Sequence, residues 1–391
     1  MTANQTGGQI ISTILRHDRK QNSYKLALIR AIGNIATAYP EFGDSGRTVA
    51  IPLRMLAEEW IAYYWPFVSP GDPVWQGVRQ EKESGLSQDM AFRNDLTHLR
   101  NLWEKEVPNH KSPADGYVLI HDMRVPRRRN TYSDSLQQVF DKTWRRIKRS
   151  VGYPIRYAGP GEWQVFDKPT PFRKMDSNVN PLPNTRGNES CLKIGSKLWE
   201  AFQELSLWIE ALCVHEWALF TENVEQYGND TVDRGTAYRL LTDRPDNRRP
   251  LTWERNHIDL LLMEGASFTC PWSGKRINSG VKYHIDHILP LNVYPINELW
   301  NLVPTDGSTN MHAKRDLIPS TSRLQTARPR LTQTYQQYLR SDSLSRALHA
   351  DAGLRFPDLP KTNVHFPSAV TDHAVALLER VATVRNLARF K

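Results

Sequence analysis

Residues 281–315 read VKYHIDHILPLNVYPINELWNLVPTDGSTNMHAKR, and this stretch decides the fold that we expect around it. Val281 to His287 alternates and is β-prone, which predicts a strand that Pro290 ends. Asn301-Leu302-Val303 predicts a second short strand, and Asp306-Gly307-Ser308 predicts a turn and an N-cap that open a helix. The order strand, loop, strand, helix lets an Asp, a His, two Asn and a Lys converge.

Each of these residue types suits the cleavage of a phosphodiester bond. Asp286 and Asn310 offer hard oxygen donors of the kind that Mg²⁺ or Mn²⁺ prefers, with positions left over for water and phosphate. His287 titrates near neutral pH and can take a proton from an attacking water. We expect Asn301 to fix the orientation of the histidine ring and Lys314, one helical turn after Asn310, to hold a flanking phosphate.

The same residues resemble the HNH endonuclease family, whose active site is the ββα-metal fold. His287, Asn301 and Asn310 occupy the three letters, and the IDHILPL and NLVP strings are similar to those that the family uses around its two strands. The resemblance covers about fifty to sixty residues. It implies a single-metal nuclease in which Asp286 and Asn310 are ligands, His287 is the general base and Asn301 is structural.

One departure from the family concerns zinc. Many members carry two C-x-x-C pairs that hold a structural zinc, whereas this sequence has Cys270 without a partner pair. We therefore expect no structural zinc, and we expect Trp272 to pack that corner instead. Two further histidines lie in this stretch. His284 either assists the chemistry of the site, or lies at the surface, or supports the site from behind the residues that act in it. His312 is expected on a helix surface. A buried polar cluster that has lost its activity is the alternative for the whole motif.

The charge of the chain points to a polyanion as partner. The sequence has 51 Lys and Arg against 42 Asp and Glu, a net charge of +9, and residues 124–156 hold ten basic and two acidic residues, a net +8. A solvated loop and helix face is the alternative to DNA binding for this stretch. If DNA is the partner, the side chains expected to contact its phosphates are Arg127, Arg128, Arg129, Arg145, Arg146, Lys148 and Arg149, together with Arg315 beside the motif.

Outside the motif the pattern of apolar residues is mainly helical. We predict a mainly α protein with a small α+β module: a helical N-terminal domain (1–110), a basic, mostly helical middle region (111–245), the ββα-metal HNH domain (250–330) and a C-terminal helical extension (331–391). Apolar spacing predicts helices at 24–35, 53–64, 91–103, 135–150, 196–222 and 370–389, and short strands at 117–120 and 163–166. The aromatic stripe Trp199, Phe202, Trp208, Trp217 and Phe220 is expected to belong to the core.

Composition excludes several classes of protein. No window approaches the ~18 consecutive apolar residues that span a bilayer, no secretory leader is evident, and three cysteines cannot form a disulfide framework. We expect a cytoplasmic protein without a membrane partner, and the oligomeric state stays open.

The expected function is that of a divalent-metal HNH endonuclease that nicks or cuts DNA. The fragments LRHDRKQNSYKLALIRAI and IPLRMLAEEWIAYYWPF resemble the N-terminal part of bacterial stand-alone HNH proteins, which implies a role in defence against phage or foreign DNA. Two alternatives remain. One is a nuclease subunit gated by partners in a larger CRISPR-type or translocase-coupled defence complex, and the other is a catalytically silent nucleic-acid-binding protein.

Overall fold

The protein forms two compact units. Unit 1 comprises Met1–Met123 and Arg128–Pro245, and unit 2 comprises Arg124–Arg127 and Asp246–Lys391. The expected boundary near residue 245 coincides with this division, whereas 110/111 lies within unit 1 and 330/331 lies within helix α12 of unit 2. The structure, a computed structural model, describes residues 6–43, 46–77, 89–107, 112–173, 177–224, 231–243, 251–291, 293–294, 296–360, 362 and 364–390.

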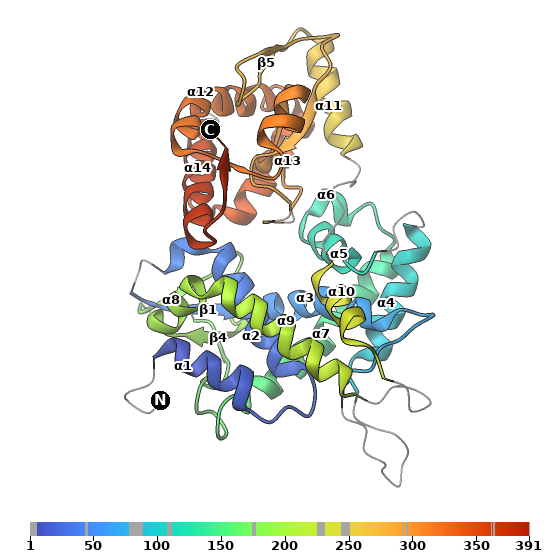
Figure 1. Ribbon diagram of the computed structural model, residues 1–391. Coiled ribbons are helices and arrows are strands. Elements are labelled where there is room, and N and C mark those ends of the chain that lie inside the picture. Colours follow the sequence, from blue (N-terminus) through green and yellow to red (C-terminus); the bar gives the residue numbers. More distant parts are fainter. Residues whose placement is uncertain are drawn as a thin grey trace. The chain divides into compact units, whose positions relative to one another are not determined.

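Unit 1 is mainly helical, as the sequence predicts (Figure 1). The apolar stripes form the expected helices α2, α3, α4 and α7, which bury large aromatic side chains such as Trp60 and Trp103 completely. Helix α7 packs against α2, α3 and α4, and α9 packs against α2 and α10. The helices are α1 (Gly7–Ser12), α2 (Tyr24–Ala38), α3 (Leu53–Tyr64), α4 (Arg93–Glu106), α5 (Asp115–Arg124), α7 (Asp134–Arg156), α8 (Ser196–Glu204), α9 (Ser206–Glu222) and α10 (Arg234–Thr242). The short helix α6 (Pro126–Arg129) begins in the segment that belongs to unit 2 and ends in unit 1.

A small sheet accompanies these helices, with strand order β2-β4-β1-β3. Strand β1 (Thr48–Pro52) pairs with β4 (Ser190–Ile194) in the antiparallel direction and with β3 (Val179–Pro181) in the parallel direction. The edge strand β2 (Thr170–Pro171) pairs with β4. The strand expected at 163–166 does not form: this stretch is a turn and bend in which Trp163 has φ 56°.

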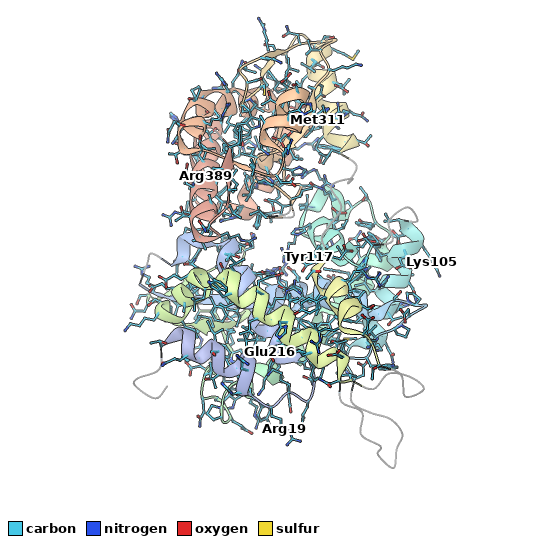
Figure 2. The ribbon with its side chains drawn as sticks, viewed as in Figure 1. Arg19, Lys105, Tyr117, Glu216, Met311 and Arg389 are labelled. Atoms are coloured by element: carbon cyan, nitrogen blue, oxygen red, sulfur yellow. The ribbon has the colours of Figure 1, made fainter. Side chains whose placement is uncertain are left out.

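The strand expected at residues 117–120 is wrong, because these residues belong to helix α5. Val118, Leu119 and Ile120 are all buried, so the helix presents apolar side chains on more than one face and shows no clear helical periodicity. Tyr117, labelled in Figure 2, places its ring 6.2 Å from that of Tyr63 in α3.

The single helix expected at residues 196–222 is interrupted at Leu205, which separates α8 from α9. The interruption changes the buried face: Trp199, Phe202 and Trp217 are in the core, but Trp208 is 70% exposed. Trp208 is therefore not the core residue that the stripe predicted. Helix α7 continues beyond the predicted end at Ser150, through Pro154.

In its described residues, unit 2 combines four α-helices with three short pairs of strands. Helices α12 and α14 pack against each other, and α13 packs against α11 and α12 (Figure 1). The helices are α11 (Thr252–Met263), α12 (Thr321–Tyr338), α13 (Asp342–Arg355) and α14 (Phe366–Val384). The pairs are β5 (Phe268–Thr269) with β6 (Arg276–Ile277), β7 (His284–His287) with β8 (Leu302–Thr305), and β9 (Ile318–Pro319) with β10 (Arg389–Phe390). The C-terminal helix thus ends earlier than predicted.

Two tyrosines of α12 fix the segment that precedes and begins β8. The hydroxyl of Tyr335 donates to the carbonyl oxygen of Trp300 at 2.5 Å, and that of Tyr338 donates to the carbonyl of Leu302 at 2.9 Å. Both tyrosine side chains are fully buried, so these bonds are shielded from water. Helix α12 therefore gives β8 a rigid support.

The three cysteines are buried free thiols. Burial raises the pKa of Cys191 to about 12, which keeps this thiol protonated at neutral pH and unreactive as a nucleophile. Among the described helices, none combines the length and the apolar character that a membrane span requires.

Candidate active site

The predicted motif folds around the antiparallel pair β7–β8. Asp286 lies opposite Val303, and His287 lies opposite Leu302. The helical turn η6 (Thr309–Lys314) follows β8; it is a π-helix, in which the N–H of Arg315 donates to the carbonyl of Asn310. Asp306 caps its start by accepting from the backbone N–H of Thr309 at 3.0 Å. Strand, strand and helical turn therefore occur in the predicted order.

Four of the five predicted side chains line one cavity of about 260 Å³: Asp286, His287, Asn310 and Lys314. Asn301 is not among the lining residues. The others that line it are Leu251, Ile285, Pro290, Leu291, Arg315 and Asp316. The cavity therefore joins two acidic, two basic, one amide and one imidazole side chain from β7, η6 and the residues after η6.

Asp286 is held by two donors. The indole Nε1 of Trp272 donates to Oδ2 at 2.9 Å, and the ammonium of Lys314 lies 3.1 Å from Oδ1. Burial raises the pKa of Asp286 above its usual value of 3.8, while Lys314 and Trp272 act in the opposite direction. Trp272 packs this corner as expected, and its bond to the carboxylate is a contact that the sequence analysis missed.

The ring of His287 is oriented by Asn297, which corrects the prediction that Asn301 performs this role. His287 Nε2 lies 2.6 Å from the amide oxygen Oδ1 of Asn297. Because an amide oxygen only accepts, Nε2 carries the proton and the lone pair of the neutral ring is on Nδ1. Asn297 lies in the connection between β7 and β8, where no spacing rule distinguishes it from the neighbouring loop residues.

Asn301 binds the backbone of the same connection instead. Its Oδ1 accepts from the N–H of Leu289 at 2.8 Å, and its Nδ2 donates to the carbonyl of Leu289 at 3.0 Å. Asn301 and Leu289 are both fully buried. These two hydrogen bonds close the turn that follows His287, so the contacts of Asn301 are structural.

Lys314 is only 1% exposed and its ammonium is bound to protein acceptors, which argues against the predicted role of holding a flanking phosphate. Its ammonium donates to Asp286 and also to the carbonyl of His287 at 2.7 Å. The reason is the π-helical turn, which directs Lys314 toward β7. Two other side chains of η6, Met311 and His312, are exposed, so His312 is a surface residue as expected.

The donor types in the cavity fit a divalent cation. Asp286 and Asn310 provide a carboxylate and an amide oxygen, and Mg²⁺ commonly binds through one or two such ligands and keeps several waters. Each carboxylate oxygen has a second lone pair beyond the one used by its donor. Among the described residues, no group of three His, Cys, Asp or Glu is arranged to hold a metal. The ammonium of Lys314 competes with a divalent cation for Asp286.

A cluster of buried charges lies next to Asn297. The Arg127 guanidinium donates to both carboxylate oxygens of Asp351, to Glu254 at 3.2 Å and to the carbonyl of Asn297 at 3.2 Å. These contacts correct the prediction that Arg127 binds DNA. In the same cluster, burial raises the pKa of Glu298 to about 7.

The other predicted DNA-binding side chains of unit 1 divide into two groups. Arg128 lies 3.6 Å from Asp122, and Arg129 lies 3.0 Å from Asp141, so carboxylates already neutralise this pair. The second group projects from the face of α7 opposite its buried residues. In this group Arg145, Arg146 and Arg149 are exposed, and Lys148 is half-buried over the ring of Trp144.

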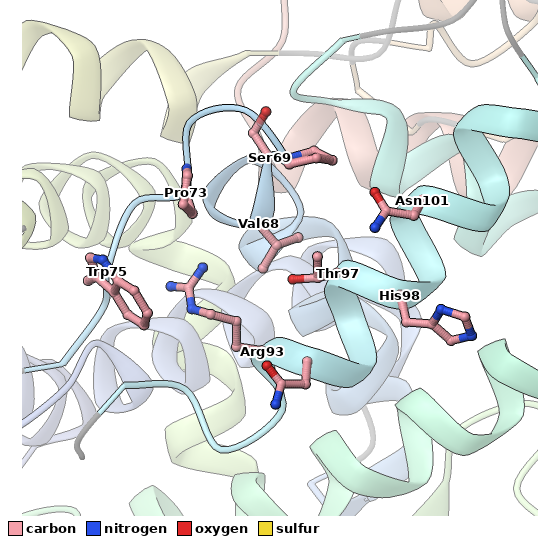
Figure 3. Close-up of a pocket in the computed structure, with 10 residues that line it drawn as sticks. Val68, Ser69, Pro73, Trp75, Arg93, Thr97, His98 and Asn101 are labelled. Atoms are coloured by element: carbon pink, nitrogen blue, oxygen red, sulfur yellow. The ribbon is translucent and has the colours of Figure 1, made fainter. Parts of the chain in front are cut away.

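Unit 1 has a hollow of its own, of about 370 Å³ (Figure 3). Arg93 stacks on the ring of Trp75 at 4.5 Å and donates to the carbonyls of Phe67 and Val74, which holds one wall. Arg93 is the first residue of α4, and the same helix adds Thr97, His98 and Asn101 to the lining. No pattern in the sequence predicts this hollow.

Comparison with known proteins gives one result. Residues 4–241 match the family model described as "Domain of unknown function (DUF8808)". No curated protein and no solved structure matches the chain. The matched stretch ends before Leu251, so the residues that line the cavity of unit 2 lie outside it.

Proposed function

We propose that this chain, which belongs to the DUF8808 family of unknown function, is a divalent-metal-dependent HNH endonuclease that hydrolyses DNA phosphodiester bonds. One observation carries the proposal. Asp286, His287 and Asn310 come from β7 and η6 and line a single cavity. A carboxylate, an imidazole and an amide in one hollow suit the hydrolysis of a phosphodiester, as metal ligands and as a general base.

In this proposal His287 acts as the general base. With the proton of the neutral ring on Nε2, bound to Asn297, the Nδ1 lone pair accepts a proton from the water that attacks phosphorus. The bond between phosphorus and the leaving 3′-oxygen breaks as the new P–O bond forms. A Mg²⁺ or Mn²⁺ ion held by Asp286 and Asn310 would neutralise the charge that develops on the leaving oxygen.

The exposed basic face of α7 supports DNA as the substrate. Arg145, Arg146 and Arg149 provide phosphate contacts that position a duplex without reading its sequence. Arg315 is exposed at the rim of the cavity, where it suits a phosphate next to the scissile bond. The resemblance to stand-alone HNH proteins supports defence against phage or foreign DNA as the setting.

The Lys314–Asp286 ion pair favours a second candidate, a nuclease that stays silent until a partner or trigger acts. An ammonium 3.1 Å from Oδ1 neutralises the carboxylate on which the cation depends. Metal binding then requires this pair to open or to share the oxygen. A partner that draws Lys314 away would switch the site on.

Conversion of supercoiled plasmid by the purified full chain tests the proposal. We expect nicked or linear DNA with Mg²⁺ or Mn²⁺, no product with EDTA, and no product with His287→Ala. A wild-type chain that binds DNA in a mobility-shift assay but leaves it intact with either metal would contradict the free-standing nuclease. In that case the partner-gated or silent protein becomes the better description.

A further inference from the structure

We propose that Arg127 is a positioning residue for the general base His287, acting through Asn297. The proposal rests on the proposed function in one respect, namely that His287 is the base. It goes beyond it because Arg127 lies far from the motif in sequence, 170 residues before Asn297.

Arg127 fixes the backbone of the β7–β8 connection at two points. It donates directly to the carbonyl of Asn297 at 3.2 Å. It also binds Asp351, whose Oδ2 accepts from the backbone N–H of Leu299 at 2.7 Å. The guanidinium lies 5.2 Å from the ring centre of Trp253, and the side chain is only 17% exposed. A planar guanidinium is suited to several such acceptors at once.

The fixed backbone determines where the Asn297 side chain lies. Asn297 is 2% exposed, and its Oδ1 makes the 2.6 Å hydrogen bond to His287. Its Nδ2 is buried and has no hydrogen-bond partner among the described residues. A buried unpaired amide donor costs about 1–3 kcal/mol, so Asn297 does not hold this position through its own amide alone. The contacts of Arg127 supply the restraint.

Charge explains why the residue at this position is a cation. Glu254 and Asp351 are each 1% exposed, and both accept from Arg127. Glu254 and Asp351 share this guanidinium, so its loss removes a positive charge from beside two buried carboxylates. The chain contributes only Arg124–Arg127 to unit 2 from its N-terminal part, so Arg127 reaches this cluster as part of a short segment.

The test uses the full chain with Arg127→Met and with the charge-balanced pair Arg127→Met/Asp351→Asn, which removes one cation and one anion together. Arg389→Met is the matched control. Arg389 also binds a carboxylate, that of Glu379, and a backbone carbonyl, that of Pro319, but it does not touch the loop at Asn297 (Arg389 is labelled in Figure 2).

Two quantities are measured, the tautomer of His287 by ¹⁵N-histidine NMR at one fixed pH and the kcat and KM of plasmid nicking. We expect both Arg127 variants to lose the uniform Nε2–H form and to lower kcat about 10- to 100-fold with KM for DNA unchanged. We expect Arg389→Met to match wild type in both.

The charge-balanced variant keeps the test decisive if Arg127→Met does not fold. A folded Arg127→Met/Asp351→Asn chain with the wild-type His287 tautomer and wild-type kcat would overturn the proposal. A wild-type chain that does not cleave DNA would instead remove the proposed function. The NMR comparison then decides the role of Arg127 by itself, since the tautomer does not depend on turnover.

Discussion

Replacing Asn301 with alanine should destabilise unit 2 strongly rather than remove a chemical group from the site. The amide of Asn301 satisfies both the N–H and the carbonyl of Leu289, and both residues are fully buried. Each buried backbone group left unpaired costs about 1–3 kcal/mol, so the sum is on the order of 4 kcal/mol. That is a large part of the roughly 5–15 kcal/mol that stabilises a typical domain.

The assay must report on unit 2 separately, because a chain with two units does not guarantee two-state unfolding. Hydrogen exchange measured by mass spectrometry at increasing urea concentration follows peptides from β7, β8 and α12 individually. The matched control is Asn310→Ala, since the half-buried Asn310 side chain has no hydrogen bond to any described residue. We expect this control to change stability by less than about 0.5 kcal/mol.

Two results would refute this reasoning. One is an Asn301→Ala chain whose unit 2 peptides open at the urea concentration of wild type. The other is equal destabilisation by Asn301→Ala and Asn310→Ala, which would show that the bonds to Leu289 contribute nothing specific. A stable Asn301→Ala chain without nuclease activity would assign Asn301 to the chemistry instead.

Three further predictions concern charge and hydrogen bonding. Burial raises the pKa of Glu298 from 4.5 to about 7, so between these pH values the folded state keeps a proton that the unfolded state releases. The free energy of unfolding of unit 2 should therefore fall by about 3 kcal/mol from pH 4.5 to 7. Glu298→Gln should flatten this pH profile, as measured by urea unfolding. Trp272→Phe keeps an aromatic ring but removes the N–H that donates to Asp286. It should lower the free energy of unfolding by about 1.5–3 kcal/mol in the same assay. An unchanged urea midpoint would show that this hydrogen bond does not stabilise the fold. Changing Arg145 and Arg149 to glutamine should weaken DNA binding. It should also reduce the slope of log Kd against log salt by about one per lost phosphate contact. An unchanged slope would show that α7 is not part of the DNA interface.

Amphipathic periodicity was sufficient to predict much of the fold. Helices α2, α3 and α4 follow from apolar residues at helical spacing; α4 has one face in the core and one toward solvent, whereas no residue of α2 or α3 is exposed. Helix α5 was predicted as a strand because Val118, Leu119 and Ile120 form a short apolar run, which fits a strand equally well. All three side chains are buried. The break between α8 and α9 at Leu205 was not predicted because the apolar stripe continues across it.

The candidate site was predictable only where its residues are close in sequence. Spacing brought Asp286, His287, Asn310 and Lys314 to one cavity. The burial of Lys314 depends on the π-helical form of η6. No residue pattern in the sequence predicts this form. Arg127 comes from 224 residues before Asp351, and a contact over such a distance depends on the whole fold of unit 2.

The most direct test of the central claim compares two histidines of unit 2 in the plasmid assay. His287 lines the cavity and is bonded to Asn297, whereas His312 is exposed on η6. We expect His287→Ala to reduce Mg²⁺-dependent nicking about 10²- to 10⁴-fold, the usual contribution of a general base, and His312→Ala to keep the wild-type rate. Equal rates for wild type and His287→Ala would contradict a nuclease centred on His287.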